Sequence, residues 1–462
     1  MLDLAGGIKM IKKLSNFFVG MVERWIPDPL VIAALLTALV LVLSVTVADF
    51  GVVETVDAWG GSFWSLLRFT GQMILILVFG HALAGTPPTR RLLQSAAERI
   101  NTARGAYIIV CFVTAITALF SWGLALVVGA IFARTVAESL KAKNVAVHYP
   151  LLVASSYAGF VVWHQGLSGS IPLVVNTPSH FLEGTIGMIP VAATIFSPIN
   201  MAVAFLILLT LPFVMASQAP SISDCNPLPD HLDSDQSDHS SLGSGQGADA
   251  VVHSKGSPAE RIENSRGLNV FLVLLGVAYL GVFFIRDGGS LNLDILNFMF
   301  LLAGLALSRS PKEYLELLTD AAKVIGPFLI QYPLYAGLMG VMAASGLGAM
   351  VVDFFVSIAS AESLPILSFV SAGVLNIFIP SGGGQWAVQG PIVVNAALAL
   401  GADMPRVVMA VAWGDQWTNM IQPLFAIPLL AIAGLHIRDI MGYCVIALLY
   451  TGVVFVAALA LF

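Results

Sequence analysis

The sequence predicts an all-α polytopic membrane protein made of two repeats, each with a re-entrant hairpin and a broken transmembrane helix. Hydrophobic residues make up 58% of the 462 residues and charged residues only 10%, whereas about a quarter of the residues of a soluble domain are charged. The mean hydropathy is correspondingly high, at +0.89. Because a helix needs about 20 apolar residues to cross a bilayer, the apolar segments predict about 10–12 spans.

Charge and cysteine content exclude several functional classes. The formal net charge is −6, but the acidic excess is concentrated in one loop, so no nucleic-acid partner is predicted. The three cysteines, Cys111, Cys225 and Cys444, have neither metal-site nor disulfide spacing. We therefore predict no metal site and no cofactor, and the lipid bilayer is the expected environment of the chain.

Matching prolines in the two halves indicate an internal duplication. Pro150 and Pro365 are separated by the same offset as Pro190 and Pro405 (365 − 150 and 405 − 190, both 215). The predicted domains are an amphipathic lead-in at 1–29, a first repeat at 30–216, a disordered acidic and Ser-rich linker at 217–266, and a second repeat plus C-terminal span at 267–462.

The start of the chain sets the predicted orientation. Residues 30–48 form the first span, which is longer than the apolar core of a signal peptide and is therefore kept as a retained helix. The loop at 49–61 contains acids but no Lys or Arg, whereas the lead-in and residues 89–104 are basic. Since basic residues favour the cytoplasmic side, the N-terminus is predicted to be cytoplasmic.

The rest of the first half contains one ambiguous segment. A second span at 66–85 is followed by a basic amphipathic surface helix at 89–104. Residues 105–140 fit either one long tilted helix or two short spans that turn near 121–123. After the polar stretch at 150–180, a long helix at 187–215 is predicted to kink or break near Pro198, because proline cannot donate to the helical ladder.

The second half repeats this order. The sequence predicts spans at 267–285 and 292–308, an amphipathic helix at 311–325, a second ambiguous segment at 326–361, a helix at 405–432 interrupted at 413–419, and a last span at 440–461. The nine residues LLTDAAKVI at 317–325 parallel LLQSAAERI at 92–100.

Residues 376–391, NIFIPSGGGQWAVQGP, are the strongest candidate for a binding site. Three consecutive glycines open the backbone to approach by other groups, and we do not expect this stretch to form a regular membrane helix. Irregular backbone persists in a bilayer only where protein or a water-filled cavity satisfies its polar groups. Small residues also serve close helix packing, but the two glutamines beside the glycines favour a functional role.

A polar counterpart at 163–180 and a broken helix in each half complete the pattern. Transporters built from repeats place the N-termini of half-helices toward an anionic group and hold a coupling cation at unwound backbone. Asp415 lies in the middle of the second broken helix, where an ionised carboxylate is costly and usually functional.

Three motifs carry a family resemblance. GLSGSIPLVVNTPSH at 166–180, IPSGGGQWAVQGPIV at 379–393 and GDQWTNMIQPLFAIPLL at 414–430 resemble the short-chain fatty acid transporter family, the acetoacetate/butyrate permeases of the ion transporter superfamily. The resemblance implies uptake of short-chain carboxylates with a proton or a sodium ion across a bacterial plasma (inner) membrane. It also implies a homodimer and two hairpins of opposite orientation, hence inverted repeats, which favours two spans at 105–140.

Chemistry suggests a role for each candidate residue. Because the membrane segments offer no interior Lys or Arg, backbone amides and neutral side chains would accept the carboxylate, and Trp163, Phe160 and Trp386 would contact its alkyl chain. Asp415 is the predicted cation ligand, and a histidine would relay protons. The predicted substrate-binding residues are Ser168, Gly169, Asn176, Thr177, Ser381, Gly382, Gly383, Gly384, Gln385, Trp386 and Gln389, and the predicted ion-coupling residues are Asp415, Gln416, Thr418, Asn419 and His164.

Other functional classes stay open at this point. A channel or a transporter for another small organic anion would share the polar hairpins. An intramembrane aspartyl protease is disfavoured because Ala412 occupies the first glycine position of its G-x-G-D motif, and the chain has no HExxH or GxxxxGK[ST] motif. We therefore expect a transporter and no enzyme, with the acid and the coupling cation undecided.

Overall fold

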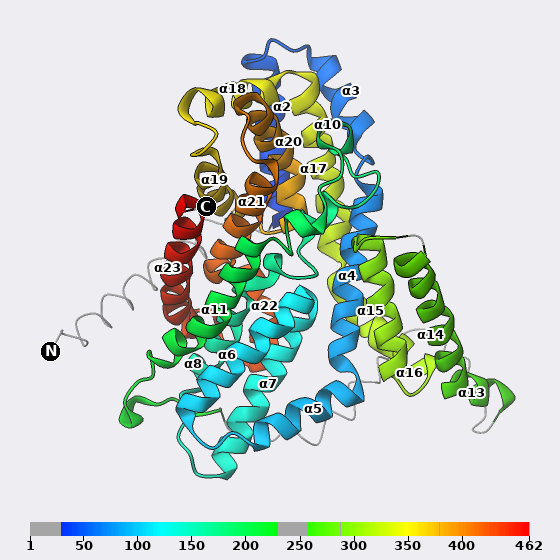
Figure 1. Ribbon diagram of the computed structural model, residues 1–462, viewed down its shortest axis with the longest axis vertical. Coiled ribbons are helices and arrows are strands. Elements are labelled where there is room, and N and C mark those ends of the chain that lie inside the picture. Colours follow the sequence, from blue (N-terminus) through cyan, green and yellow to red (C-terminus); the bar gives the residue numbers. More distant parts are fainter. Residues whose placement is uncertain (1–28, 230–256, 287, 378, 462) are drawn as a thin grey trace.

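The computed structural model describes residues 29–229, 257–286, 288–377 and 379–461, and within these ranges the regular elements are all helices (Figure 1). The predicted lead-in and the centre of the predicted linker lie outside the described residues. The helices α2, α3, α17, α18 and α20 gather at one end of the elongated molecule, and α5 to α8 form the other end (Figure 1).

The first half consists of helices joined by short turns. Its elements are α2 (Pro29–Thr46), α3 (Val52–Ser62), α4 (Leu67–Gly85), α5 (Pro87–Glu98), α6 (Ala103–Phe120), α7 (Trp122–Ala142), α8 (Tyr149–Gly159), the 3-10 helix η1 (Phe160–Gln165), α9 (Ser170–Val174), α10 (Glu183–Ile186), η2 (Val191–Ala193), α11 (Pro198–Ala216) and η3 (Ile222–Asp224).

The second half has the same character. Its elements are α13 (Pro258–Glu263), α14 (Arg266–Gly281), the π-helical turn η5 (Val282–Arg286), α15 (Leu293–Leu307), α16 (Pro311–Ala321), η6 (Ala322–Val324), α17 (Gly326–Ala344), α18 (Leu347–Ile358), α19 (Leu364–Asn376), α20 (Gly382–Leu400), α21 (Met404–Thr418), η7 (Asn419–Ile421), α22 (Pro423–Ala433) and α23 (Ile437–Leu461).

The helices confirm an all-α polytopic membrane protein. Six helices of the described residues are long and apolar enough to cross a bilayer, and the bent pair α17 and α18 raises the number to seven. Three shorter apolar helices, α2, α15 and α19, are further candidates. The predicted 10–12 spans require these shorter helices to cross as well.

Both ambiguous segments contain two helices. In the first, Ser121 adopts an extended conformation, and its Oγ accepts a hydrogen bond from Leu124 N, so α7 starts afresh and packs against α6. In the second, Gly346 has a left-handed conformation with a φ of 78°, and the axes on either side of the break are bent by 76°.

The prediction of a long helix at 187–215 was wrong. Helix α11 begins at Pro198, and the preceding residues form a short 3-10 turn and coil. Proline in the first turn of a helix forfeits no intrahelical hydrogen bond, and Ser197 caps this turn by accepting a hydrogen bond from Asn200 N at 3.3 Å. Pro198 therefore starts a helix instead of breaking one.

The prediction that 376–391 forms no regular helix was also wrong. Helix α20 begins at Gly382 and continues through the glycines and Pro391, so only the short connection before it is irregular. Ser381 Oγ caps the helix by accepting a hydrogen bond from Gly384 N at 3.3 Å. Proline is tolerated inside membrane helices because neighbouring groups satisfy the freed carbonyls.

Three smaller boundaries also differ from the sequence predictions. The predicted loop at 49–61 contains α3. The second broken helix is interrupted after Thr418 instead of at 413–419, so Asp415 is helical. The described ends of the predicted disordered linker are ordered: Asn226 bonds to both His148 and Tyr149, and 258–263 form α13.

The order of elements agrees with the predicted duplication. In each half a span, α4 or α15, is followed by an amphipathic helix with proline in its first turn, α5 or α16. Pro150 and Pro365 both lie in the first turn of their helices, α8 and α19. Pro405 likewise lies in the first turn of α21, whereas Pro190 precedes the short 3-10 helix η2. Inversion of the two repeats stays a prediction.

Helices α19 and α21 approach each other closely at a glycine. A Cβ added at Gly414 would lie 2.2 Å from Phe369 O and 2.7 Å from Ala372 Cβ. Backbone cannot move aside as the end of a side chain can, so this contact requires glycine. Because Gly414 precedes Asp415, the contact also fixes the position of that carboxylate.

We expect Gly414→Ala to destabilise the protein by about 1–3 kcal/mol through overpacking. The measurement is the melting temperature of the purified protein in detergent. Melting is monitored as the loss of the peak of monodisperse protein on heating. Gly71→Ala in α4 is the matched control, because nothing lies within 4 Å of a Cβ added there. Equal melting temperatures for the two variants would show that α19 and α21 are not held this closely.

Candidate functional site

A small cavity lies where the two halves of the chain meet, and we call it the inner cavity. Its volume is about 30 Å³, which is room for roughly one or two water molecules. The lining residues come from α4, α7, η1, α9, α17, α20 and α22 and from the connection before α20; they are Met73, Trp122, Trp163, Ser170, Tyr332, Pro380, Ser381, Gly382, Gly383 and Phe425. None of these described residues is Lys or Arg, as the sequence predicted.

The N-terminus of α20 forms one wall of the inner cavity. The amides of Gly382 and Gly383 precede the first intrahelical hydrogen bond of a 19-residue helix, and such amides attract anions together with the helix dipole. The cap residue Ser381 also lies 3.0 Å from the hydroxyl of Tyr332 through its Oγ. The wall therefore presents backbone amides and two hydroxyl groups without a formal charge.

The glycines let neighbouring polar groups come close to this helix end. A Cβ at Gly382 would lie 2.3 Å from His164 Nε2 and 2.7 Å from Ser170 Oγ. A Cβ at Gly383 would lie 2.8 Å from Tyr332 Oη. Side chains at these positions would fill the space beside the first-turn amides of α20.

His164 links the inner cavity to Asp415. Its Nε2 lies 3.3 Å from Ser170 Oγ and 3.4 Å from Asp415 Oδ2, and both His164 and Asp415 have fully buried side chains. In the described structure neither carboxylate oxygen of Asp415 has a hydrogen-bond partner. Gln416 Oε1 accepts a hydrogen bond from His164 N at 2.8 Å and holds the η1 backbone against α21. A carboxylate without donors is costly in a dry interior, so this pair is the electrostatic centre of the site.

Side chains near Asp415 satisfy the broken end of α21. Asn376 Nδ2 donates to Asp415 O at 2.9 Å and lies 3.0 Å from Thr418 Oγ1. Tyr157 Oη donates to Asn419 O at 2.6 Å. With its amide oxygen turned toward Trp163, Asn419 accepts the indole N–H at 3.0 Å. The predicted ion-coupling residues are thus brought together, although Thr418 and Asn419 bond to structural partners.

Several predicted substrate residues instead support the fold around the site. Ser168 Oγ accepts a hydrogen bond from Trp122 N at 2.8 Å and so caps α7. Gln385 donates to Ala372 O at 3.0 Å and ties α20 to α19. Gln389 accepts from Gln385 at 3.0 Å and donates to Ser371 Oγ at the same distance. The close approach at Gly384 is to the ring of Tyr335, and a Cβ at Gly169 would lie 2.4 Å from His164 O.

Two predicted residues lie at a different place. Asn176 Nδ2 donates to Leu291 O at 2.7 Å, and Thr177 Oγ1 accepts from Leu293 N at 3.2 Å. Both therefore contact the start of α15, away from the residues that line the inner cavity. Trp386 is fully buried and does not line the inner cavity either.

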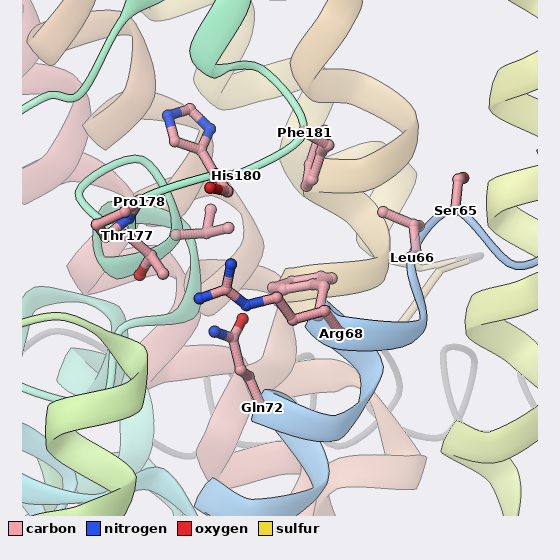
Figure 2. A pocket seen from close by; sticks show the side chains of 11 residues that line it. Ser65, Leu66, Arg68, Gln72, Thr177, Pro178, His180 and Phe181 are labelled. Atoms are coloured by element: carbon pink, nitrogen blue, oxygen red, sulfur yellow. The ribbon is translucent and has the colours of Figure 1, made fainter.

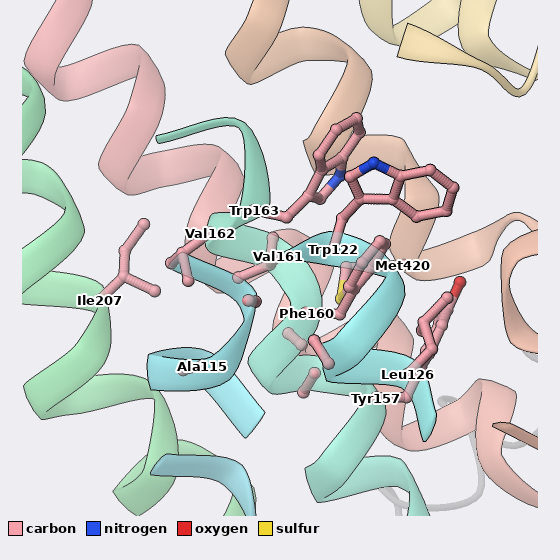
Figure 3. Packing of buried hydrophobic residues seen from close by; sticks show 14 of the residues in the cluster. Ala115, Trp122, Leu126, Tyr157, Phe160, Val161, Val162, Trp163, Ile207 and Met420 are labelled. Carbon is pink, nitrogen blue, oxygen red and sulfur yellow. The ribbon is translucent and has the colours of Figure 1, made fainter. Parts of the chain in front are cut away.

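Aromatic rings pack together beside the inner cavity, and Figure 3 shows Trp122, Trp163, Phe160 and Tyr157 in this packing. Trp163 stacks on Phe160 with ring centroids 5.8 Å apart, and Phe160 stacks on Tyr157 at 6.2 Å. Trp122 and Phe425 lie 6.1 Å and 6.4 Å from Trp163. Trp163 faces the cavity and Phe160 lies behind it, so the predicted aromatic contact to an alkyl chain is available from Trp163.

The sequence analysis missed several residues of the site. Tyr332 lies in the apolar segment 326–361, in which the sequence indicated no binding residue. Ser170 lies in the motif at 166–180, but no role was predicted for it. Phe425 follows the helix break in the third motif. No local pattern in the sequence distinguishes these residues from others that only pack between helices.

Comparisons with known proteins identify the family. The chain matches the family described as short chain fatty acid transporter over residues 10–462. It is 41% identical over 453 residues to a protein of Escherichia coli, covering 98% of this chain and 100% of that protein. A Haemophilus influenzae protein is 37% identical over 457 residues, covering 97% and 99%. The names of both relatives assign them to short-chain fatty acid transport.

Two solved structures share the fold at low sequence identity. Neisseria gonorrhoeae MtrF, reported as illuminating a class of antimetabolite efflux pumps, has a TM-score of 0.52 at 15% identity and covers 97% of each chain. The Alcanivorax borkumensis YdaH transporter, reported to have an unusual topology, has a TM-score of 0.52 at 16% identity and covers 93% of this chain and 98% of its own. The chain therefore belongs to the short-chain fatty acid transporter family, as its motifs predicted, and is a multi-pass membrane transporter and not an enzyme.

Proposed function

We propose that this transporter takes up short-chain monocarboxylates, such as butyrate or acetoacetate, by cation-coupled alternating access in a bacterial inner membrane. The observation that carries the proposal is the meeting of three elements at the inner cavity. The α20 N-terminus supplies amides, η1 supplies His164, and α21 supplies Asp415 at 3.4 Å from that histidine.

The carboxylate would bind the first-turn amides of α20. Hydroxyl groups of Ser170, Ser381 and Tyr332 surround the same space and would donate to its oxygens. Neutral donors and a helix N-terminus hold a single negative charge without a cationic side chain. Such a binding site would hold a monoanion weakly enough to release it on the other side of the membrane.

The coupling cation that fits this geometry best is a proton shared by His164 and Asp415. A substrate anion at Gly382 would lie close to the Asp415 carboxylate, and two negative charges repel strongly where water is excluded. One proton on the pair removes that repulsion. Binding of the proton therefore strengthens binding of the substrate anion, and binding of the anion strengthens binding of the proton. A sodium ion at Asp415 is the second candidate, because the carboxylate oxygens lack donors.

The small volume of the inner cavity supports a transport cycle with an occluded state. About 30 Å³ does not accommodate a four-carbon acid, so side chains or helices must move for substrate to enter. The break between α21 and α22 lies just before the lining residue Phe425, and these helices are the elements that would rearrange. A channel would instead conduct without such a step.

Uptake into proteoliposomes tests the proposal directly. With labelled butyrate and an imposed proton gradient, inside alkaline, we expect faster and acetoacetate-competed uptake relative to protein-free liposomes, into which butyric acid enters by passive diffusion. An imposed sodium gradient of equal size should produce no such acceleration. Accumulation with sodium alone would assign coupling to sodium, and ohmic current without accumulation would contradict a carrier.

Asp415→Asn should abolish gradient-driven accumulation while leaving exchange of labelled for unlabelled butyrate across the membrane. Asparagine mimics the protonated acid and removes the repulsion, but it cannot release a proton. Both activities are measured in the same proteoliposomes. Asp353→Asn, at an exposed position of α18, is the matched control and should accumulate butyrate normally. Normal accumulation by Asp415→Asn would exclude this carboxylate from coupling.

Gly382→Ala should raise the half-saturating butyrate concentration by about tenfold or more, which is about 1.4 kcal/mol. The added Cβ would lie 2.3 Å from His164 Nε2 and would fill the space over the amides. The measurement is initial uptake as a function of butyrate concentration. Gly71→Ala serves as the control, since its Cβ would meet nothing within 4 Å. An unchanged half-saturating concentration would place the carboxylate elsewhere.

A further inference from the structure

A second, larger cavity lies beside the first, and we call it the outer cavity (Figure 2). Its volume is about 100 Å³. It lies between the start of α4 and the segment that follows α9, and its lining includes Arg68, Phe69, Gln72, Thr177, His180 and Phe181. Figure 2 shows Arg68 and Gln72 reaching from α4 toward the segment with Thr177 and His180.

Arg68 lines the outer cavity and is already paired with the carboxylate of Asp294, a residue outside the lining. Its Nη2 lies 2.9 Å from Asp294 Oδ2, and Gln72 Nε2 donates to Asp294 Oδ1 at 2.7 Å. The side chains of Arg68 and Asp294 are about half exposed, at 56% and 51%. An exposed ion pair of this kind contributes little to stability, so it opens readily when another carboxylate competes.

The guanidinium of Arg68 has more donors than Asp294 uses. Arginine carries five N–H groups in a planar fork, and within the described structure Asp294 is the residue to which Arg68 bonds. Apolar groups of Leu66, Val174 and Phe181 line the same cavity. A guanidinium beside a small apolar surface fits a short-chain carboxylate.

One aromatic side chain separates the outer cavity from the inner cavity. Phe69 lines the outer cavity, and its ring contacts Phe181 at 5.9 Å and Tyr332 at 5.6 Å. Tyr332 lines the inner cavity, and a Cβ at Gly383 would lie 2.7 Å from Phe69 Cζ. A carboxylate on Arg68 would therefore be one ring away from the α20 amides.

We propose that the outer cavity is a second carboxylate site, in which Arg68 exchanges Asp294 for a short-chain acid before the acid passes Phe69 to the inner cavity. The passage of the acid from the outer to the inner cavity rests on the proposed function. Binding of the acid at Arg68 does not, and it can be tested without transport. Asp294 acts as an internal competitor that keeps the outer site weak. The two partners of this ion pair consequently have opposite effects on substrate binding.

Protection of a cysteine from labelling measures occupancy of the outer cavity. Ser65 is exposed and lines this cavity, so Ser65→Cys in a Cys225→Ser background provides the reporter, while Cys111 and Cys444 are buried. The full-length protein is treated with the neutral reagent methyl methanethiosulfonate, with butyrate or its uncharged analogue butyramide. We expect butyrate, and not butyramide, to slow labelling.

Variants of the ion pair decide the role of Arg68. Arg68→Gln should raise the half-protecting butyrate concentration by roughly fivefold or more, and Asp294→Asn should lower it by roughly fivefold. Arg68→Lys keeps the charge and should retain protection. A structural ion pair would respond in the same direction to loss of either partner, so parallel effects of Arg68→Gln and Asp294→Asn would overturn the proposal.

A variant of the inner site separates this inference from the proposed function. In Gly382→Ala, protection by butyrate should persist although uptake is impaired. Loss of protection in Gly382→Ala would show that labelling reports only the inner cavity. Absence of protection in the parent protein, which carries only Ser65→Cys and Cys225→Ser, would show that no outer site exists. Protection without any butyrate uptake by the parent would retain the outer site and refute the proposed function.

Discussion

The structure depends on how helix ends are satisfied inside a membrane. Hydrocarbon offers no hydrogen bonds to the free amides and carbonyls of a helix terminus. Ser168 caps the start of α7, Tyr157 binds the carbonyls at the broken end of α21, and Gln422 donates to the last carbonyls of α19. At the start of α20 the cap residue Ser381 accepts from Gly384, and the amides of Gly382 and Gly383 face a cavity. The broken elements are thus held by side chains, and the start of α20 is the helix end at which we propose that substrate binds.

Residues from separate elements meet at this helix end, which is what coupling requires. The glycine amides belong to α20, His164 to η1, and Asp415 to α21. The histidine contacts the other two, because Gly382 lacks a side chain and Asp415 lies 3.4 Å away. In the proposed cycle, a shift of α20 or η1 relative to α21 would change the charge near a bound anion. On this proposal, substrate occupancy and helix rearrangement would be linked through the buried side chain of His164.

The sequence was sufficient for the fold class, the family and the principal polar positions, because glycine runs and a buried acid are conspicuous in apolar sequence. It was misleading about α20: glycine and proline disfavour helices by intrinsic propensity, but tertiary contacts with Tyr332, Tyr335 and His164 and the Ser381 cap override that preference. Hydroxyl and aromatic residues within long apolar helices, Tyr332 and Phe69 among them, carry no pattern that separates a cavity wall from packing. Their role depends on which helices become neighbours, and that information is not local.

The distribution of charge along the proposed path follows from the cost of burying it. Arg68 is about half exposed and already paired, so a cation there costs little and can attract anions from solution. The same guanidinium next to the fully buried His164 and Asp415 would form a strong ion pair with the carboxylate and compete with the substrate. Neutral amides avoid this competition and still favour a single negative charge through the helix dipole. On the two proposals, a charged outer site would capture the anion and an uncharged inner site would select it, and Phe69 between them would allow the two sites to be occupied in turn.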